Sequence, residues 1–73
     1  MNIHQLIEGK EYRLTHAYGQ PDQKVKVLKV SEKTCPKWGK YWSADVIYTS
    51  EDCSKGLQMS MNTIECERYI HPL

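Results

Sequence analysis

The chain has 73 residues, of which 40% are hydrophobic and 26% are charged, and its formal net charge is +1. This length allows one domain, 1–73, with a small apolar core, and the composition is too apolar for a disordered protein. No stretch approaches the roughly 18 apolar residues of a membrane span, and the polar start lacks the apolar core of a secretion signal. We therefore expect a cytoplasmic protein.

The small net charge hides an asymmetry along the chain. Residues 1–40 hold eight Lys/Arg and four Asp/Glu, giving +4, whereas residues 41–73 hold two and five, giving −3. If the strand order keeps these halves apart, one surface is basic and another acidic. Such surfaces suit a protein partner better than duplex DNA, because neutralising many phosphates takes a larger basic excess.

The N-terminal residues predict a helical turn followed by a strand. Asn2 can cap a short turn in which Ile3, Leu6 and Ile7 share one side, and Gly9 would end it in the left-handed conformation. This turn is expected to cover one end of the core. Residues 11–17 then alternate, with Tyr12, Leu14 and His16 on one face, and residues 18–23 are predicted to form a loop.

Residues 24–30, KVKVLKV, alternate lysine and apolar residues as a half-buried strand requires. The apolar side changes midway, because Val25 and Val27 share one face while Leu28 and Val30 share the other. A β-bulge near Val27 or Leu28 would restore a common core face and bend the strand. The alternative is a strand that is buried on both faces at its end.

The second half predicts two more long strands and a short closing strand. Residues 34–40 carry Pro36 and Gly39 and are predicted to form a loop, and residues 50–56 a polar connection. Between and after them lie strands 41–49 and 57–62, whose expected inward side chains are Trp42, Ala44, Val46, Tyr48, Leu57, Met59 and Met61. Residues 63–66 are expected to form one 3₁₀ turn capped by Asn62 or Thr63, before a strand at 68–70 that Pro72 ends.

Four long strands, a bulged second strand and a single turn before a short last strand resemble the SH3-like barrel, the architecture of tudor, chromo-barrel and KOW-type modules. The predicted fold class is therefore all-β, a small antiparallel barrel of four to five strands with a short N-terminal helical turn. An OB-like barrel formed by the same strands is the alternative.

The cysteines are odd in number and lack a C-x-x-C pair, so we expect reduced thiols rather than a disulfide framework. Each of Cys35, Cys53 and Cys66 is interpreted as a small apolar side chain. The alternative is a zinc site with His16 or His71 as fourth ligand, although metal knuckles usually bring two ligands close in sequence. No cofactor or metal is predicted.

Catalysis is not predicted from local sequence. A nucleophile with its base, paired carboxylates and a metal with an open position are all missing, and His4, His16 and His71 are scattered over helix, strand and tail. Single glycines in turns do not make a phosphate loop. We therefore expect a protein that is not an enzyme.

The loop around Trp38 is the first candidate binding site, because Lys37, Trp38, Lys40 and Tyr41 bring aromatics and cations together. An exposed tryptophan flanked by lysines is typical of a binding hot spot or a base-stacking platform. In the alternative, Trp38 folds back as a plug over the barrel end. Trp42 is assigned to the core.

Lys24, Lys26 and Lys29 form the second candidate site, a row of cations along one strand. If they bind, the target is a phosphate backbone or an acidic protein surface. Otherwise, lysines on an edge strand prevent edge-to-edge aggregation without binding anything.

Two functional hypotheses follow. The first is a monomeric protein-binding module that docks on a larger assembly, and the second is a small barrel that binds single-stranded nucleic acid through the lysine row and Trp38. By its length, single-domain character and general appearance, the chain resembles small phage-encoded regulators of bacterial RNA polymerase. That resemblance implies a site at the β′ N-terminal region near the RNA exit channel, interference with sigma factor, inhibition of initiation, antitermination and a host cytoplasmic location. It assigns no contact residue here.

Overall fold

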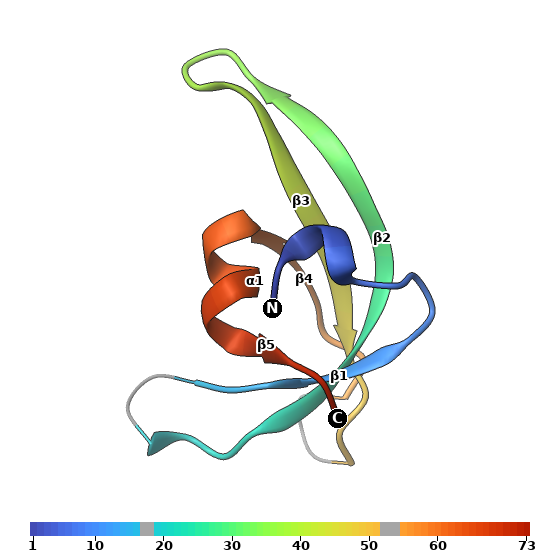
Figure 1. Cartoon of the computed structure of the whole chain (residues 1–73). Helices are drawn as coiled ribbons and strands as arrows, with labels where there is room; N and C mark the ends of the chain where they lie inside the picture. Colours follow the sequence, from blue (N-terminus) through green and yellow to red (C-terminus); the bar gives the residue numbers. More distant parts are fainter. Residues whose placement is uncertain (17–18, 52–54) are drawn as a thin grey trace.

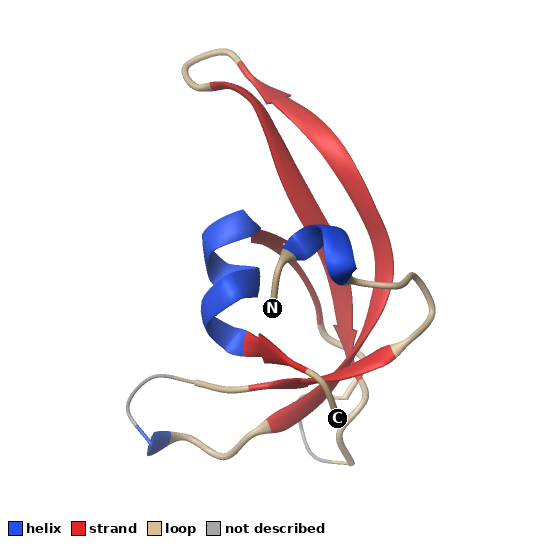
Figure 2. Cartoon of the chain, in the orientation of Figure 1, coloured by secondary structure: helices blue, strands red, loops and turns tan. Residues whose placement is uncertain are grey.

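A computed structural model describes residues 1–16, 19–51 and 55–73. These residues form a short 3₁₀ helix, five strands and one α-helix (Figure 2). In chain order they are η1 (Ile3–Gln5), β1 (Glu11–Leu14), β2 (Gln23–Cys35), β3 (Gly39–Tyr48), β4 (Gln58–Asn62), α1 (Thr63–Tyr69) and β5 (Ile70–His71).

The strands form one antiparallel sheet in the order β4-β3-β2-β1-β5 (Figure 1). The first four strands follow one another as a meander, and β5 returns after α1 to pair with β1. The predicted all-β fold class is confirmed. Within the described residues β4 and β5 do not pair, so the sheet curls without closing.

The strand predictions were right in position and wrong in extent. Each of the four alternating stretches lies on a strand, but the predicted loop 34–40 is wrong, because β2 continues to Cys35 and β3 begins at Gly39. Three residues suffice for the turn, since Gly39 takes a φ of +83° that closes a short hairpin at low cost. Ala17, the predicted end of the first strand, lies outside the described residues.

The β-bulge predicted near Val27 or Leu28 is confirmed. Val27 pairs with Val46 and Lys29 with Asp45, which leaves Leu28 as the extra residue. Val30 then shares the inner face with Val27, whereas Leu28 itself is exposed. The bulge therefore lets a long strand continue with its apolar residues toward one core.

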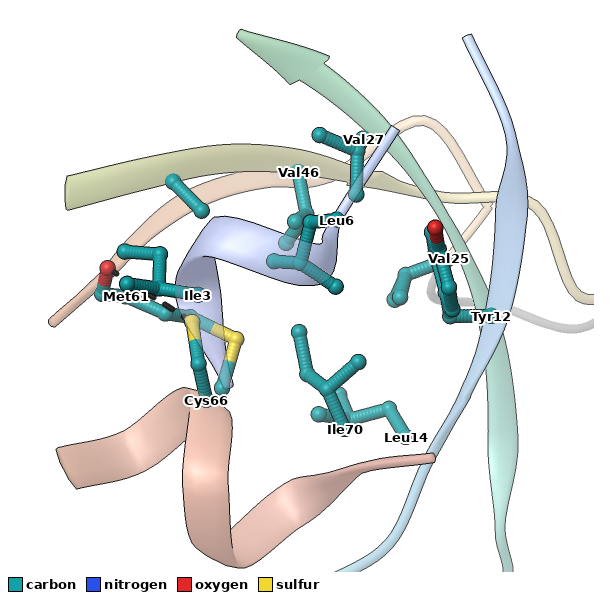
Figure 3. Packing of buried hydrophobic residues seen from close by; sticks show 11 residues of the cluster. Ile3, Leu6, Tyr12, Leu14, Val25, Val27, Val46, Met61, Cys66 and Ile70 are labelled. Atoms are coloured by element: carbon teal, nitrogen blue, oxygen red, sulfur yellow. Dashed lines mark hydrogen bonds between the residues drawn. The ribbon is translucent and has the colours of Figure 1, made fainter. Parts of the chain in front are cut away.

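The core lies between the curled sheet, η1 and α1 (Figure 3). Its buried members are Ile3, Leu6, Tyr12, Leu14, Val25, Val27, Ala44, Val46, Met61, Cys66 and Ile70. Tyr12 is buried with its hydroxyl paired, because Tyr12 Oη accepts the Ile7 N–H at 2.9 Å. Three predictions of buried side chains are wrong: Trp42, Leu57 and Ile7 are exposed.

Both helices begin at predicted caps. The Asn2 side chain accepts the His4 N–H at η1, and Gly9 follows with a φ of +85°. At α1 a capping box forms, in which Asn62 Oδ1 accepts the Glu65 N–H at 2.9 Å and Glu65 Oε1 accepts the Asn62 N–H at 3.2 Å. This box starts a seven-residue α-helix, so the predicted 3₁₀ turn at 63–66 is wrong. The predicted short closing strand is present, but it occupies Ile70–His71 instead of 68–70.

The end of α1 receives the Met1 ammonium group. Met1 N donates to the carbonyl oxygens of Cys66, Glu67 and Ile70 at 2.9, 3.1 and 2.8 Å. Cys66 O also accepts the Ile70 N–H at the helix end, and a positive charge at a helix C-terminus favours the helix dipole. The N-terminus thereby fixes the helix that borders the candidate site.

Candidate functional site

The β2–β3 hairpin extends beyond the rest of the sheet as an arm, which we define as residues 31–43 (Figure 1). β1 pairs with β2 only up to Lys26, and β4 pairs with β3 only from Ser43. Residues 39–42 of β3 consequently have a strand on one side only. The arm is therefore a two-stranded ribbon whose end carries the predicted Trp38 loop.

Trp38 lies at the tip of this arm with 79% of its surface exposed, so the plug alternative is wrong. Lys37 Nζ lies 5.9 Å from the centroid of the Trp38 ring, within the range of a cation–π contact. Lys40 and Tyr41 follow on β3 and are exposed as well. The structure thus places Lys37, Trp38, Lys40 and Tyr41 on one projecting element.

An apolar groove of about 460 Å³ runs between the arm and the start of α1. It is lined by Cys35, Trp38, Tyr41, Trp42, Asn62, Thr63 and Ile64. β4 ends at Asn62, where the capping box begins α1. The strand therefore does not continue along the edge of β3, and the groove lies beside this uncovered edge. Large exposed apolar side chains gathered beside an open strand are typical of an interaction surface.

Trp42 and Ile64 are the large apolar groove residues that were not predicted as site residues from the sequence. Trp42 shares the inner face of β3 with Ala44 but lies beyond the core, where 37% of it is exposed. The His4 ring holds it edge-on, with ring centroids 4.9 Å apart. Ile64 is 59% exposed in the first turn of α1. The only sequence signal for it is an apolar residue two positions after the helix cap Asn62.

The lysine row does not join the Trp38 site. Lys24, Lys26 and Lys29 are exposed on the other half of β2, and Lys24 lies about 35 Å along the strand from Cys35 at roughly 3.3 Å per residue. The interpretation as edge protection is wrong for Lys24 and Lys26, because β1 and β3 pair with that part of β2 on both sides. Glu11 faces Lys26 across the ladder.

Asp45 forms a polar cluster at the base of the arm. Ser60 Oγ donates to Asp45 Oδ1 at 2.6 Å and Lys33 Nζ lies 3.5 Å from the same oxygen. The hydrogen bond from Ser60 is the main cause that lowers the pKa of the Asp45 carboxyl, with Lys33 and Lys29 adding to it. The cluster ties β2, β3 and β4 together where the arm leaves the sheet.

The charge asymmetry of the sequence does not become two separate surfaces. The strand order places β5, from the acidic second half, beside β1 from the basic first half, while β3 and β4 lie on the other side. Lysines and carboxylates are therefore interleaved, as at Lys29 opposite Asp45. A uniform basic surface for a phosphate backbone is not built by this arrangement.

The described thiols and imidazoles do not form a metal centre. Within residues 1–16, 19–51 and 55–73 no three or more His, Cys, Asp or Glu side chains gather in a way that could hold a metal ion. Burial raises the pKa of the Cys66 thiol to about 11, and His71 Nε2 lies 3.1 Å from Thr15 Oγ1. Cys53 lies outside the described residues.

Comparison with known proteins adds no family to this geometry. No protein-family model matches the chain, no curated protein is significantly similar to it, and no solved structure matches its fold significantly. In the described part of the chain, neither helix has the length and apolar character to cross a bilayer. The arm and its groove are therefore the features of this chain that bear on its function.

Proposed function

We propose that this protein is a non-catalytic protein-binding module that docks on a larger assembly through the arm and the groove beside it. The observation that carries the proposal is Trp38, largely exposed at the end of a projecting hairpin and flanked by Lys37. Tryptophan is among the residues most enriched in binding hot spots. Trp42 and Ile64 extend the same apolar surface toward the body of the domain.

The assembly that we propose is bacterial RNA polymerase. The support is the resemblance in length and single-domain character to phage-encoded regulators of that enzyme. By that resemblance the protein acts as a monomer in the host cytoplasm, binds the β′ N-terminal region near the RNA exit channel, inhibits initiation and promotes antitermination. A small domain acts in this way by occupying a surface, which needs a contact site and no catalytic group.

Single-strand nucleic-acid binding is the second candidate. Exposed lysines along β2 and an exposed tryptophan favour it. Against it, Lys24 and Lys26 lie near the end of β2 that is far from the Trp38 turn, with Lys29 at the middle of the strand, and carboxylates stand beside the row at Glu11 and Asp45. A stacking platform with an electrostatic groove needs both features side by side, so we favour the protein target.

The test is a binding measurement on immobilised bacterial RNA polymerase core enzyme. The double variant Lys37→Ala, Trp38→Ala should bind at least about 30-fold more weakly, as expected for a hot spot of roughly 2 kcal/mol. Its matched control, Lys24→Ala, Lys26→Ala, removes two exposed cations elsewhere and should bind as the unmodified chain does.

Three results separate the candidates. Equal binding by the arm variant would contradict the assignment of the site. Absence of binding by the unmodified chain would contradict the choice of polymerase. Saturable binding of single-stranded RNA at physiological salt, lost on replacing the lysine row, would favour the second candidate.

A further inference from the structure

The outer edge of β3 is open in the arm. Tyr48 exchanges both backbone hydrogen bonds with the β4 side, donating to Leu57 O at 2.8 Å and accepting from Gly56 N at 2.9 Å. Thr49 N–H instead donates toward β2, to Lys24 O. Because backbone groups alternate along an antiparallel strand, the even-numbered residues of β3 face β4.

Lys40 and Trp42 are the even-numbered residues that lie beyond the end of β4, whose last partner on β3 is Ser43. Their backbone N–H and C=O groups therefore point to an edge that no described strand covers. Among the described residues no hydrogen bond occupies the Lys40 N–H, the Lys40 C=O or the Trp42 N–H, whereas the Ser43–Asn62 pair at the end of the ladder engages the Trp42 C=O. These three groups form a short row of free donors and acceptors beside the apolar groove lined by Trp38, Trp42 and Ile64.

The opposite edge of the arm differs in chemistry. There the Val30 N–H is already bound, since Glu8 Oε2 accepts it at 2.9 Å, and the next residue facing outward is the charged Glu32. Charged side chains and capped amides on an edge discourage strand addition. The two edges of the ribbon thus differ: the β3 edge carries Lys40 and Trp42 beside the apolar groove, and the β2 edge carries the already bound Val30 amide and Glu32.

We infer that the open edge of β3 binds an extended segment of a partner protein as an added strand. This inference rests on the proposed function and specifies its mode of recognition. The backbone of the segment pairs with Lys40 and Trp42, its alternate apolar side chains enter the groove, and an acidic residue lies near Lys37 and Lys40.

The test replaces single backbone N–H groups by N-methyl groups in chemically synthesised protein, with Cys35 as the ligation junction. Methylation of the Trp42 amide blocks the open edge of β3. Methylation of the Glu32 amide is the matched control, because Glu32 is the cross-strand partner of Trp42 and its amide faces the other edge. Neither amide belongs to a ladder of the domain, so both proteins should keep the native circular dichroism spectrum.

The probe is a displayed library of random linear peptides selected on the unmodified protein. We expect enriched peptides with alternating apolar residues and an acidic residue at one end. Methylation at Trp42 should weaken their binding about tenfold or more, and methylation at Glu32 by less than about twofold. In the unmodified protein, bound peptide should also slow hydrogen exchange of the Lys40 and Trp42 amides.

Two results would overturn strand addition: no enrichment of extended peptides, or equal weakening by the two methyl groups. Peptides that depend on the Trp38 side chain but not on the Trp42 amide would leave the proposed function standing and refute this mode of binding. If the chain does not bind RNA polymerase but the selected peptides depend on the Trp42 amide, the choice of polymerase is rejected and strand addition at the edge of β3 is supported.

Discussion

The capping box at Asn62 should decide whether α1, and with it one wall of the groove, is formed. In the variant Asn62→Ala the Glu65 N–H loses the acceptor that lies 2.9 Å away, while the helix itself has only seven residues. Loss of such a cap costs about 1 kcal/mol, within a range of roughly 0.5–2 kcal/mol. For a domain of this size that corresponds to a fall in Tm of about 4–8 °C.

The loss is a large part of the total stability. At about 0.05–0.15 kcal/mol per residue, a chain of 73 residues has roughly 4–11 kcal/mol of unfolding free energy. Urea denaturation followed by far-ultraviolet circular dichroism measures the difference. The control is Asn62→Asp, which keeps an acceptor at the cap and adds a negative charge that the helix N-terminus favours, so it should match the unmodified chain.

A free energy of unfolding of the Asn62→Ala variant within about 0.3 kcal/mol of that of the unmodified protein would refute the stabilising role of the cap. That role would equally be refuted if the aspartate variant were as unstable as the alanine variant, since the cap would then not be the cause. Glu65 still accepts the backbone N–H of residue 62 in all three chains, so the comparison isolates the side-chain acceptor.

Three further predictions concern single side chains. Iodide should quench Trp38 fluorescence more strongly than that of Trp42, measured in single-tryptophan variants, because 79% of the former and 37% of the latter is exposed; equal quenching would contradict the arm geometry. The free energy of unfolding should fall between about pH 9 and pH 11, because the Cys66 thiol has a pKa near 9.0 in the unfolded chain and about 11 in the folded protein. Denaturation midpoints measured across this pH range should decline less steeply in a Cys66→Ala variant. Gly39→Ala should cost about 1 kcal/mol in urea denaturation through its φ of +83° alone, since no atom lies within 4 Å of the added methyl group; an unchanged midpoint would contradict that backbone conformation.

The strands were predictable because alternation is a local property. Lysine and valine alternate in β2 with a single change of side, and that change predicted the bulge that leaves Leu28 unpaired. Cap residues are equally local, so Asn2 was predicted as a cap, and Asn62 was one of the two caps predicted for the second turn.

The extent of the core was not predictable in the same way. Trp42 alternates correctly with Ala44, but alternation gives the side of the sheet and not how far the core reaches along a strand. Residues 34–40 contain Pro36 and Gly39, which mark a turn without fixing its length. The turn takes only three residues, so the hairpin became an arm.

The groove depends on contacts between distant parts of the chain. Ile64 in α1 comes close to Trp38 and Trp42 only because β4 pairs with β3 and ends at Asn62. No spacing in the sequence encodes that approach. The sequence therefore predicted the Trp38 side of the groove, whereas the Ile64 side could be identified only from the three-dimensional structure.

The most direct test of protein docking at the arm is site-specific photocrosslinking in bacterial extract supplemented with RNA polymerase. A benzophenone side chain at Ile64 lies in the groove, and the same group at Leu73, also exposed, lies in a different cleft and serves as control. The proposal predicts a protein adduct on a polymerase subunit from position 64 and none from position 73. Equal adducts from both positions, or adducts only with nucleic acid, would contradict it.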